Sequence, residues 1–413
     1  MQKSVRLTAL VSATLFAFSH SPGMANDWKT SPPAEQGLNA RILAKMNSHA
    51  LAELPHIRSL LIARHGYLVF EQHYNGASPH ELQNVQSITK SVTSALIGMA
   101  IKQGRIGLDQ KVIGFFPEIE SPLDPRTRTV TIRHLLTMSS GIWRDPPQWG
   151  KNDDDPPRSA LTQPLDGDPG AKFFYSGYAQ HILSAILCRA THQTVLDFAG
   201  VNLFRPLGIS EVVWYKDKNG MELGCGSSLW KAADILKLGQ LYLNKGRWNG
   251  AELIPEWYVS ESTKTQLTGD FFGTRISYGF LWFTGTISGH ETYHAAGYGG
   301  QYLLVVPDLD LVILCTSDWR QPEYPEHYAL VKDFVIPSVM EPQSAIPRPI
   351  LHLPADACSR STVQGDAALE SQSAIIEHRS QANAKVIRSA ASAALSLEPP
   401  RCFRGPDGSG FSI

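Results

Sequence analysis

Two short stretches of the sequence combine residue types whose spacing could do chemistry. The first is an H-E-x-x-H at His290–His294, the pattern in which a helix carries two zinc-binding histidines and a glutamate base. The second is an S-x-x-K at Ser87–Lys90, where a helix would place a lysine amine one turn from a serine hydroxyl. The first would make the chain a metalloenzyme, and the second would make it an acyl-transfer enzyme.

The sequence around H-E-x-x-H disfavours a zinc site. Gly289 precedes the first histidine, and A-A-G-Y-G-G follows His294. No helical apolar period continues on either side, whereas a zinc site of this kind needs one helix turn between its two histidines. We expect the end of one strand, a turn and the start of another strand, with no metal bound.

The S-x-x-K at Ser87 lies at the head of a segment that is apolar on nearly every side, Ser87 to Ile101. That pattern predicts a helix buried inside the protein. The helix dipole favours negative charge near Ser87, and a lysine among apolar side chains loses solvation, which favours its neutral form. We therefore predict that Ser87 is a nucleophile and that Lys90 is its base.

A second S-x-x-K occurs at Ser228–Lys231, so the pattern alone is weak. Here it opens the amphipathic segment 229–243, which predicts an ordinary surface helix. We expect Ser228 to be the N-cap of that helix and Lys231 to be solvated. The first copy is the better candidate because its helix is the buried one.

The elements around these motifs indicate an α+β fold. Two strands that turn at His65-Gly66 are expected at one end of the chain, and further strands at the other end, with helices between them. An antiparallel sheet completed by distant segments, flanked by helices and carrying an inserted, mostly helical region, would satisfy this order. The predicted strands are 57–74, 278–284, 301–306 and 311–316, the predicted helices are 87–101, 130–138, 180–190 and 229–243, and 144–169 is a predicted loop.

Bulk composition gives no sign of a nucleic-acid or membrane partner. The chain has 413 residues, 43% of them hydrophobic and 18% charged, with 37 Lys and Arg against 38 Asp and Glu. A net charge near zero does not indicate a nucleic-acid or anionic-membrane partner, either of which would favour a basic surface.

The first 25 residues have the pattern of a signal peptide. Lys3 and Arg6 precede the mostly apolar run 7–18, and Gly23-Met24-Ala25 offers a cleavage site. The run is too short to span a bilayer, so we expect export to the periplasm or secretion, with no stable membrane insertion. The mature chain would begin near Asn26.

The five cysteines are far apart in the sequence. Cys188 and Cys315 lie in apolar runs and are expected to be inert core residues, as buried cysteines usually are. Cys358 and Cys402 bracket the tail and could pair in an oxidising compartment. The count is odd, so at least one thiol stays free or pairs between chains.

Three motifs in order resemble the serine beta-lactamase and penicillin-binding-protein superfamily, in its class C and esterase-like branch. They are S-I-T-K at 87–90, P-G-A-K-F-F-Y-S-G at 169–177 and H-A-A-G at 294–297. Connecting phrases agree, among them V-T-I-R-H-L-L-T-M-S-S-G-I from Val130 and L-F-R-P-L-G-I from Leu203. L-G-Q-L-Y-L-N-K-G-R-W-N-G from Leu238 is similar to the 6-aminohexanoate-oligomer hydrolases of that branch. The resemblance covers about residues 40 to 343.

The resemblance implies one hydrolase domain, residues 26–345, with the beta-lactamase/transpeptidase-like fold. Its sheet part would be about 40–120 and 250–345, and its helical part about 121–249. Residues 346–413 form an Ala- and Ser-rich tail outside the resemblance.

The resemblance also implies acyl transfer without a cofactor. Ser87 would attack an ester or amide carbonyl, while Lys90 and Tyr175 would move its proton to the leaving group. The backbone N–H groups of Ser87 and Tyr298 would form the oxyanion hole. Gly297 and Gly299 would let the backbone approach the substrate closely.

Two departures from the family motifs bear on the substrate. The second motif, usually Y-x-N, is Tyr175-Ser176-Gly177 here, and Ala295 and Ala296 replace the Lys and Thr of K-T-G. The Lys and Thr side chains that would bind the carboxylate of a substrate are therefore absent, although His294 could partly replace them. We expect a small, less anionic ester or amide, and weak or no beta-lactamase and DD-peptidase activity. Residues proposed to line the substrate pocket are His294, Gly297, Trp143, Trp149, Trp214 and Tyr215.

Two rival hypotheses stay open. One is a penicillin-binding sensor or scaffold on the same fold that forms an acyl adduct on Ser87 without turnover. The other is the zinc hydrolase, which would keep its activity after Ser87→Ala and lose it to a chelator. The oligomeric state is not indicated by the sequence.

Overall fold

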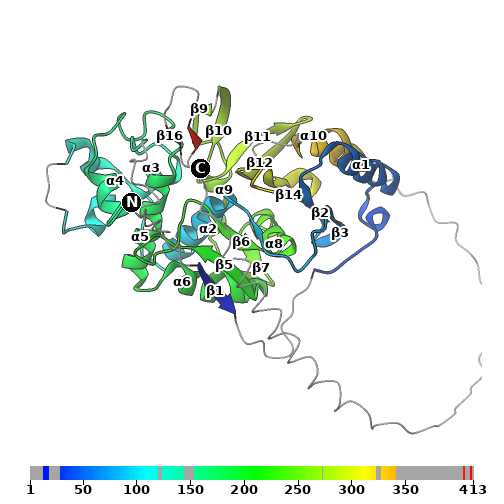
Figure 1. The fold of residues 1–413 in the computed structure, drawn as a ribbon, viewed down its shortest axis with the longest axis horizontal. Helices are drawn as coiled ribbons and strands as arrows, with labels where there is room; N and C mark the ends of the chain where they lie inside the picture. The colour runs from blue at the N-terminus through cyan, green and yellow to red at the C-terminus, as the bar shows by residue number, and fades with distance from the viewer. Residues whose placement is uncertain are drawn as a thin grey trace, which may run out of the picture. The chain divides into compact units, whose positions relative to one another are not determined.

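The computed structural model describes residues 28–119, 123–143, 153–271, 273–321 and 327–340, together with the backbone of 13–17, 403–404 and 410–411 (Figure 1). Several predictions fall outside these residues: most of the signal peptide and tail, Trp149, and the pairing of Cys358 with Cys402. These stay predictions. The backbone of Ala13–Ala17 forms a strand, β1, antiparallel to β5 (Glu211–Tyr215).

The centre of the fold is an antiparallel sheet of eight strands in the order β3-β2-β14-β13-β12-β11-β10-β9. Strands from the two ends of the hydrolase region meet where β2 pairs with β14, as the sequence predicts. The strands are β2 (Ile57–Arg64), β3 (Tyr67–His73), β9 (Leu267–Phe271), β10 (Thr274–Tyr278), β11 (Phe283–Ile287), β12 (His290–Gly297), β13 (Gln301–Val306) and β14 (Leu311–Ser317).

Tight turns set the register of this sheet. His65 and Gly66, which join β2 to β3, have φ values of 51° and 76°, the geometry of a two-residue hairpin turn. This confirms the predicted hairpin. The predicted strand 278–284 is wrong, because a buried turn at Gly279–Trp282 separates β10 from β11. A Cβ at Gly279 would lie 2.0 Å from the Ser262 carbonyl oxygen, and the apolar run through this buried turn hides it from sequence patterns.

The two faces of the sheet pack into different clusters because side chains alternate along each strand. Leu303 and Val305 on β13 belong to the cluster shared with α2 and α8. Leu304 and Val306 belong to the cluster shared with α1. The helices are α1 (Ala40–Glu53), α2 (Ile88–Lys102), α3 (Ile132–Leu136), α4 (Pro156–Thr162), α5 (Gly177–Thr191), α6 (Val195–Ala199), α7 (Arg205–Leu207), α8 (Ala232–Leu243), α9 (Glu256–Ser262) and α10 (His327–Leu330).

A smaller sheet leads the chain into α2. Its strand order is β1-β5-β6-β4, and β4 ends three residues before Ser87. The other small pairs are β7 with β8 and β15 with β16. These strands are β4 (Gln83–Asn84), β6 (Ser228–Trp230), β7 (Arg247–Trp248), β8 (Ala251–Glu252), β15 (Phe403–Arg404) and β16 (Gly410–Phe411).

The predicted helix start at Ser228 is wrong. Ser228 lies in β6, and α8 begins at Ala232, with Lys231 at the N-cap position and no side-chain cap bond. The reason is tertiary: Leu229 pairs with Asn84 of β4 and Val213 of β5, so sheet pairing overrides the helical pattern.

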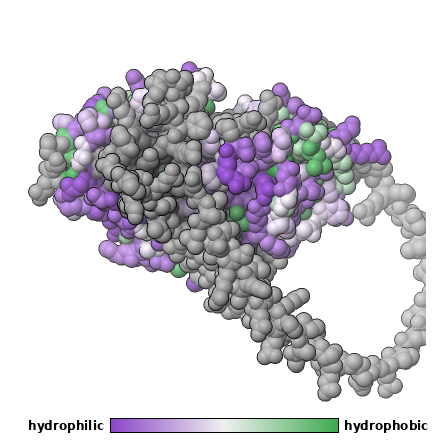
Figure 2. Space-filling view, in the orientation of Figure 1, coloured by the Kyte–Doolittle hydropathy of each residue, from purple (hydrophilic) through white to green (hydrophobic). Residues whose placement is uncertain are grey.

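Helix α2 is buried on all sides from Ile88 to Ala100, as its sequence predicts. It packs against α5 and α9 and against β12 and β13. Among the coloured residues in Figure 2, purple predominates, and the largest green patch lies near α1, where Leu51 is 64% exposed. Within the described ranges, no helix combines the length and apolar character that a bilayer span needs.

Candidate active site

Ser87 stands at the head of α2, directly after a tight turn. The Asn84 side-chain oxygen accepts a hydrogen bond from the backbone N–H of Gln86 at 2.9 Å, and Gln86 has a φ of 49°. A non-glycine residue in the left-handed region is uncommon and is often found at functional sites. The turn delivers Ser87 to the N-cap position, where its side chain makes no cap bond and remains available to Lys90.

Lys90 lies one helical turn further along α2 and is bound on several sides. Its Nζ donates to Ser87 Oγ at 2.9 Å and to the backbone carbonyl of Cys225. The same Nζ lies 4.9 Å from the centre of the Tyr175 ring. Lys90 is 1% exposed and Ser87 is 4% exposed, so their interaction is shielded from bulk water.

Tyr175 is held next to Lys90 by the start of α5. Ser176 caps that helix, accepting from the backbone N–H of Ala179 at 3.1 Å, and is 1% exposed. One residue before Tyr175, the Phe174 N–H donates to the Met138 carbonyl at 2.6 Å. The structure therefore brings Ser87 and Lys90, from the head of α2, together with Tyr175, from the segment that leads into α5, as their motifs predict.

Sequence reasoning missed the loop that carries Cys225. Its carbonyl is the second acceptor for Lys90, and the loop is fixed by Thr93 Oγ1, which donates to the Gly224 carbonyl at 2.9 Å. Trp214 Nε1 donates to the Leu223 carbonyl, also at 2.9 Å. Any residue type offers a backbone carbonyl, so no sequence signal could have identified this acceptor.

The end of β12 comes very close to the turn before Ser87. A Cβ at Gly297 would lie 2.4 Å from the Val85 carbonyl oxygen and 3.0 Å from Gln86 Cβ, so only glycine fits there. Tyr298 follows directly and opens the β12–β13 turn. The Gln301 side chain donates to the Tyr298 and Gly299 carbonyls at 3.4 and 3.1 Å, which fixes the shape of that turn.

Gly299 has a different role from the one expected. Its φ is 72°, and a Cβ there would lie 2.5 Å from Trp319 Cα. The close approach that Gly299 permits is to the backbone of Trp319 within the protein. Both glycines thus permit close packing within the protein, and the approach of their backbone to a substrate stays a prediction.

The H-E-x-x-H motif lies within one continuous strand, β12, and the turn precedes it at Ser288 and Gly289. The expected turn inside the motif is therefore wrong. Two residues four apart on a strand are about 13 Å apart, too far to share one zinc ion. His290 instead contacts Asp308 at 2.6 Å. Among the residues that the structure describes, no group of three potential metal ligands comes together.

His294 is stacked between two aromatic rings. The Phe283 ring centre lies 5.1 Å away at an interplanar angle of 9°, and the Tyr302 ring centre lies 4.7 Å away. Burial lowers the pKa of His294 to about 3, so the ring is neutral at ordinary pH. Alternation along β12 puts His294 on the opposite face from Ala295, which packs in the cluster of α2.

The predicted aromatic pocket residues have separate locations. Trp143 is 39% exposed and its ring centre lies 5.7 Å from that of Phe174. Trp214 has no exposed surface, and Tyr215, 7% exposed, packs with Val213 and Leu229. The prediction that Trp214 and Tyr215 line the substrate pocket is therefore corrected: both are packing residues of the smaller sheet.

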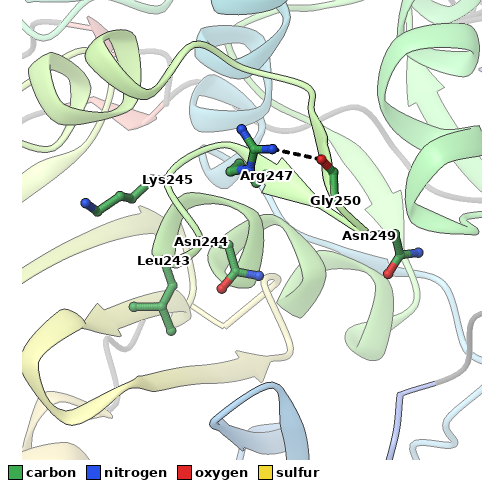
Figure 3. A pocket seen from close by; sticks show the side chains of 6 residues that line it. All are labelled: Leu243, Asn244, Lys245, Arg247, Asn249 and Gly250. Carbon is green, nitrogen blue, oxygen red and sulfur yellow. Dashed lines mark hydrogen bonds between the residues drawn. The ribbon is translucent and has the colours of Figure 1, made fainter.

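A hollow of about 380 Å³ lies at the end of α8, remote in sequence from the motifs. Figure 3 shows its lining, with the Arg247 guanidinium turned back to donate to the Gly250 carbonyl at 2.9 Å. Its lining residues are Leu243, Asn244, Lys245, Arg247, Asn249 and Gly250. The set includes none of the predicted site residues.

Cys188 and Cys315, the two cysteines expected in the core, are both free thiols. Burial raises the pKa of Cys188 to about 11, and it also raises the pKa of Cys315. A thiol with a raised pKa carries little thiolate at neutral pH and is a poor nucleophile. This agrees with the expectation that Cys188 and Cys315 are inert.

Comparison with known proteins places this geometry in a family. The beta-lactamase family model matches residues 56–335. The 6-aminohexanoate-dimer hydrolase of Paenarthrobacter ureafaciens is 22% identical over 287 residues, covering 64% of this chain and 73% of that protein. The lovastatin esterase of Penicillium rubens is 29% identical over 167 residues, covering 33% of this chain and only 41% of the esterase.

Solved structures agree on the fold. A family VIII carboxylesterase superposes with a TM-score of 0.62 at 14% identity, covering 75% of this chain and 98% of that one. A penicillin-binding protein homologue from Pyrococcus abyssi superposes with a TM-score of 0.58 at 19% identity, covering 73% of this chain and 77% of that one. The chain therefore belongs to the beta-lactamase family, has the beta-lactamase/transpeptidase-like α+β fold, and is a serine hydrolase.

Proposed function

We propose that the protein cleaves an ester or amide bond of a small molecule through an acyl-enzyme on Ser87. The observation that carries the proposal is the hydrogen bond of 2.9 Å between Lys90 Nζ and Ser87 Oγ, with Tyr175 against the same amine. A nucleophile within hydrogen-bond reach of a base, which a third group orients, is the arrangement that activates a serine.

The first half of the reaction forms the acyl-enzyme. Ser87 Oγ attacks the substrate carbonyl carbon while its proton passes to the Lys90 amine. The backbone N–H groups of Ser87 and Tyr298 receive the oxyanion. The bond to the leaving group then breaks as the leaving oxygen or nitrogen takes the proton of the Tyr175 phenol, and the proton that Lys90 took from Ser87 replaces it on Tyr175.

The second half returns the free enzyme. Water attacks the acyl carbon and gives its proton to the same Lys90–Tyr175 pair, and the acid product leaves as Ser87 regains its proton. Cys225 supports both halves, because its carbonyl gives the Lys90 amine a fixed acceptor and so orients the lone pair needed at Ser87.

The substrate we propose is small and carries no carboxylate at the third motif. Ala295 and Ala296 offer no cation or hydroxyl there, and the second motif has Gly177 where an amide side chain is usual. The names of the relatives, an amide hydrolase and an esterase, support the two bond types. Beta-lactams and peptide termini, which present a carboxylate, are expected to react weakly.

Steady-state turnover tests the proposal. Purified protein is given p-nitrophenyl acetate, p-nitrophenyl butyrate, an anilide of the same acyl group and nitrocefin. We expect many turnovers per active site on the esters and little on nitrocefin. Release of one equivalent of product followed by a halt would indicate the acyl-binding sensor instead, and hydrolysis that a chelator abolishes would indicate a metal site.

A further inference from the structure

A row of aromatic rings leads away from Tyr175 across the sheet. The ring centres of Tyr175 and Phe271 are 4.7 Å apart, and those of Phe271 and Phe283 are 5.8 Å apart. Phe283 stacks on His294 at 5.1 Å, and His294 stacks on Tyr302 at 4.7 Å. Beyond Tyr175 the rings come from β9, β11, β12 and β13, so the sheet fixes their spacing. We call these five residues the aromatic row.

The aromatic row is not a closed part of the core. Tyr175, Phe271, His294 and Tyr302 all keep partly exposed surface, whereas Phe283, between Phe271 and His294, is 7% exposed. Aromatic side chains that are partly exposed next to a reactive group are typical of ligand sites.

The aromatic row is uncharged beyond its first ring. Lys90 lies over the Tyr175 ring, while the other cation–ring contacts in the described part of the chain, from Arg133 and Arg189, are to rings outside the row. The two rings stacked on His294 desolvate it, which lowers its pKa and favours the neutral imidazole. A surface of this kind favours apolar groups over a carboxylate.

The position of Tyr175 decides which part of the substrate meets the row. In the proposed function, Tyr175 returns the proton to the leaving oxygen or nitrogen, so the leaving group must lie at the phenol. Phe271 is in contact with that phenol ring and sits on the edge strand β9. A leaving group longer than a few atoms would therefore extend over Phe271.

We propose that Phe271, which contacts the Tyr175 ring, forms a subsite for the leaving group, and that this subsite takes an uncharged aromatic or apolar alcohol or amine. The proposal rests on the proposed function, since it places the leaving group by the proton that Tyr175 donates. It adds the substrate class and names Phe271 as the residue that sets it.

Two acetate esters with alcohols of similar basicity test the subsite. Benzyl acetate has an aromatic leaving group, and 2-methoxyethyl acetate has a more polar one, while both give the same acetyl-enzyme. The wild type should prefer the benzyl ester in kcat/KM. Phe271→Ala should lower that preference about tenfold, because the lost ring is worth one aromatic contact. Phe271→Leu, which keeps apolar volume, should give an intermediate ratio.

Three controls separate the subsite from general damage and from the proposed function. Trp257→Ala removes an aromatic side chain that is 49% exposed on α9, and it should leave the ratio unchanged. The ratio of p-nitrophenyl butyrate to acetate, which varies only the acyl group, should also be unchanged in Phe271→Ala. A fluorophosphonate label on Ser87 reports whether the nucleophile is intact.

The inference is overturned if Phe271→Ala lowers both acetate esters equally, or if it alters the acyl-chain ratio in place of the leaving-group ratio. In either case continued labelling of Ser87 and hydrolysis of p-nitrophenyl acetate would leave the proposed function standing. Absence of hydrolysis by the wild type would remove the proposed function itself.

Discussion

The two S-x-x-K copies have the same spacing and opposite outcomes. In the first, Ser87 and Lys90 lie on one turn of α2 and are joined by a hydrogen bond of 2.9 Å. In the second, Ser228 lies in β6, and Lys231 follows that strand and pairs with Glu211 at 3.3 Å. Both serines are buried, so burial alone does not distinguish them.

The difference shows that spacing has chemical meaning only once the secondary structure is known. Residues i and i+3 share a face on a helix, whereas on a strand an odd separation puts them on opposite faces. Ser228 instead bonds to Thr89 Oγ1 at 2.7 Å and accepts from Trp230 Nε1 at 2.8 Å. Ser228 of the second copy is thus hydrogen-bonded to Thr89 in the first turn of α2, and that turn carries the first copy.

Exchange of each lysine for alanine tests the comparison most severely. Lys90→Ala removes the base next to Ser87 and should lower kcat/KM on p-nitrophenyl butyrate about 10³-fold. Lys231→Ala, the matched control, breaks a partly exposed ion pair and should leave the rate within about twofold. Equal losses in the two variants would show that the first copy has no special role.

Tyr175 lies beside Lys90 of the first S-x-x-K copy, so Tyr175→Phe tests the first copy alone. Loss of the phenol hydroxyl that donates a proton to the leaving group should lower kcat about 10²-fold and leave KM little changed. Tyr298→Phe is the control, since only the backbone N–H of Tyr298 is proposed to act. A Tyr175→Phe enzyme with full activity would assign the proton transfer to Lys90 alone.

The two S-x-x-K copies can be compared only at pH values where the protein is folded, and a pH series of the unfolding free energy measures that range. His327 is 2% exposed, and burial lowers its pKa to about 4, from an unfolded value of about 6.5. The unfolded state therefore binds a proton that the folded state does not, and stability is lost as pH falls from about 6.5 to about 4. The loss is on the order of 3 kcal/mol.

Urea unfolding at pH 7 and at pH 4.5 measures this loss. His327→Gln removes the titrating group and should reduce the difference between the two pH values. His294 contributes in the same direction, because its pKa is lowered to about 3. Identical pH dependence in the wild type and His327→Gln would contradict the assignment.

The smallest expected effect comes from Ser228→Ala. It leaves the Trp230 N–H and the Thr89 hydroxyl short of one partner, which should cost about 1–2 kcal/mol of unfolding free energy. Activity should fall only a few-fold. The reverse pattern is expected for Ser87→Ala, whose stability should change little while its activity disappears. A stability loss shared by both variants would weaken the contrast.

Much of the fold could be predicted because its signals are local. The β2–β3 hairpin follows from strand-forming residues on both sides of His65-Gly66, and α2 follows from an unbroken apolar run. The start of α8 and the β10–β11 turn could not be predicted. Distant strand pairing decides the first, and an apolar turn without polar residues conceals the second.

The candidate site shows the same division. Ser87 and Lys90 could be found because their spacing puts a hydroxyl and an amine on one turn of a helix, and Tyr175 because the residues around it resemble a known motif. The Cys225 carbonyl could not, since its role depends on where a loop passes and not on the residue type. The pocket prediction for Trp214 was wrong for a related reason. Composition does not distinguish a tryptophan that lines a pocket from one whose side chain is hydrogen-bonded to the backbone of a loop.

Ser87 can be tested directly as the nucleophile by labelling the protein with a fluorophosphonate and mapping the modified peptide by mass spectrometry. We expect one adduct, on Ser87, which is lost in Ser87→Ala and retained in Ser228→Ala. An adduct on another residue, or ester hydrolysis that continues at the wild-type rate in Ser87→Ala, would contradict the assignment of Ser87 as the nucleophile.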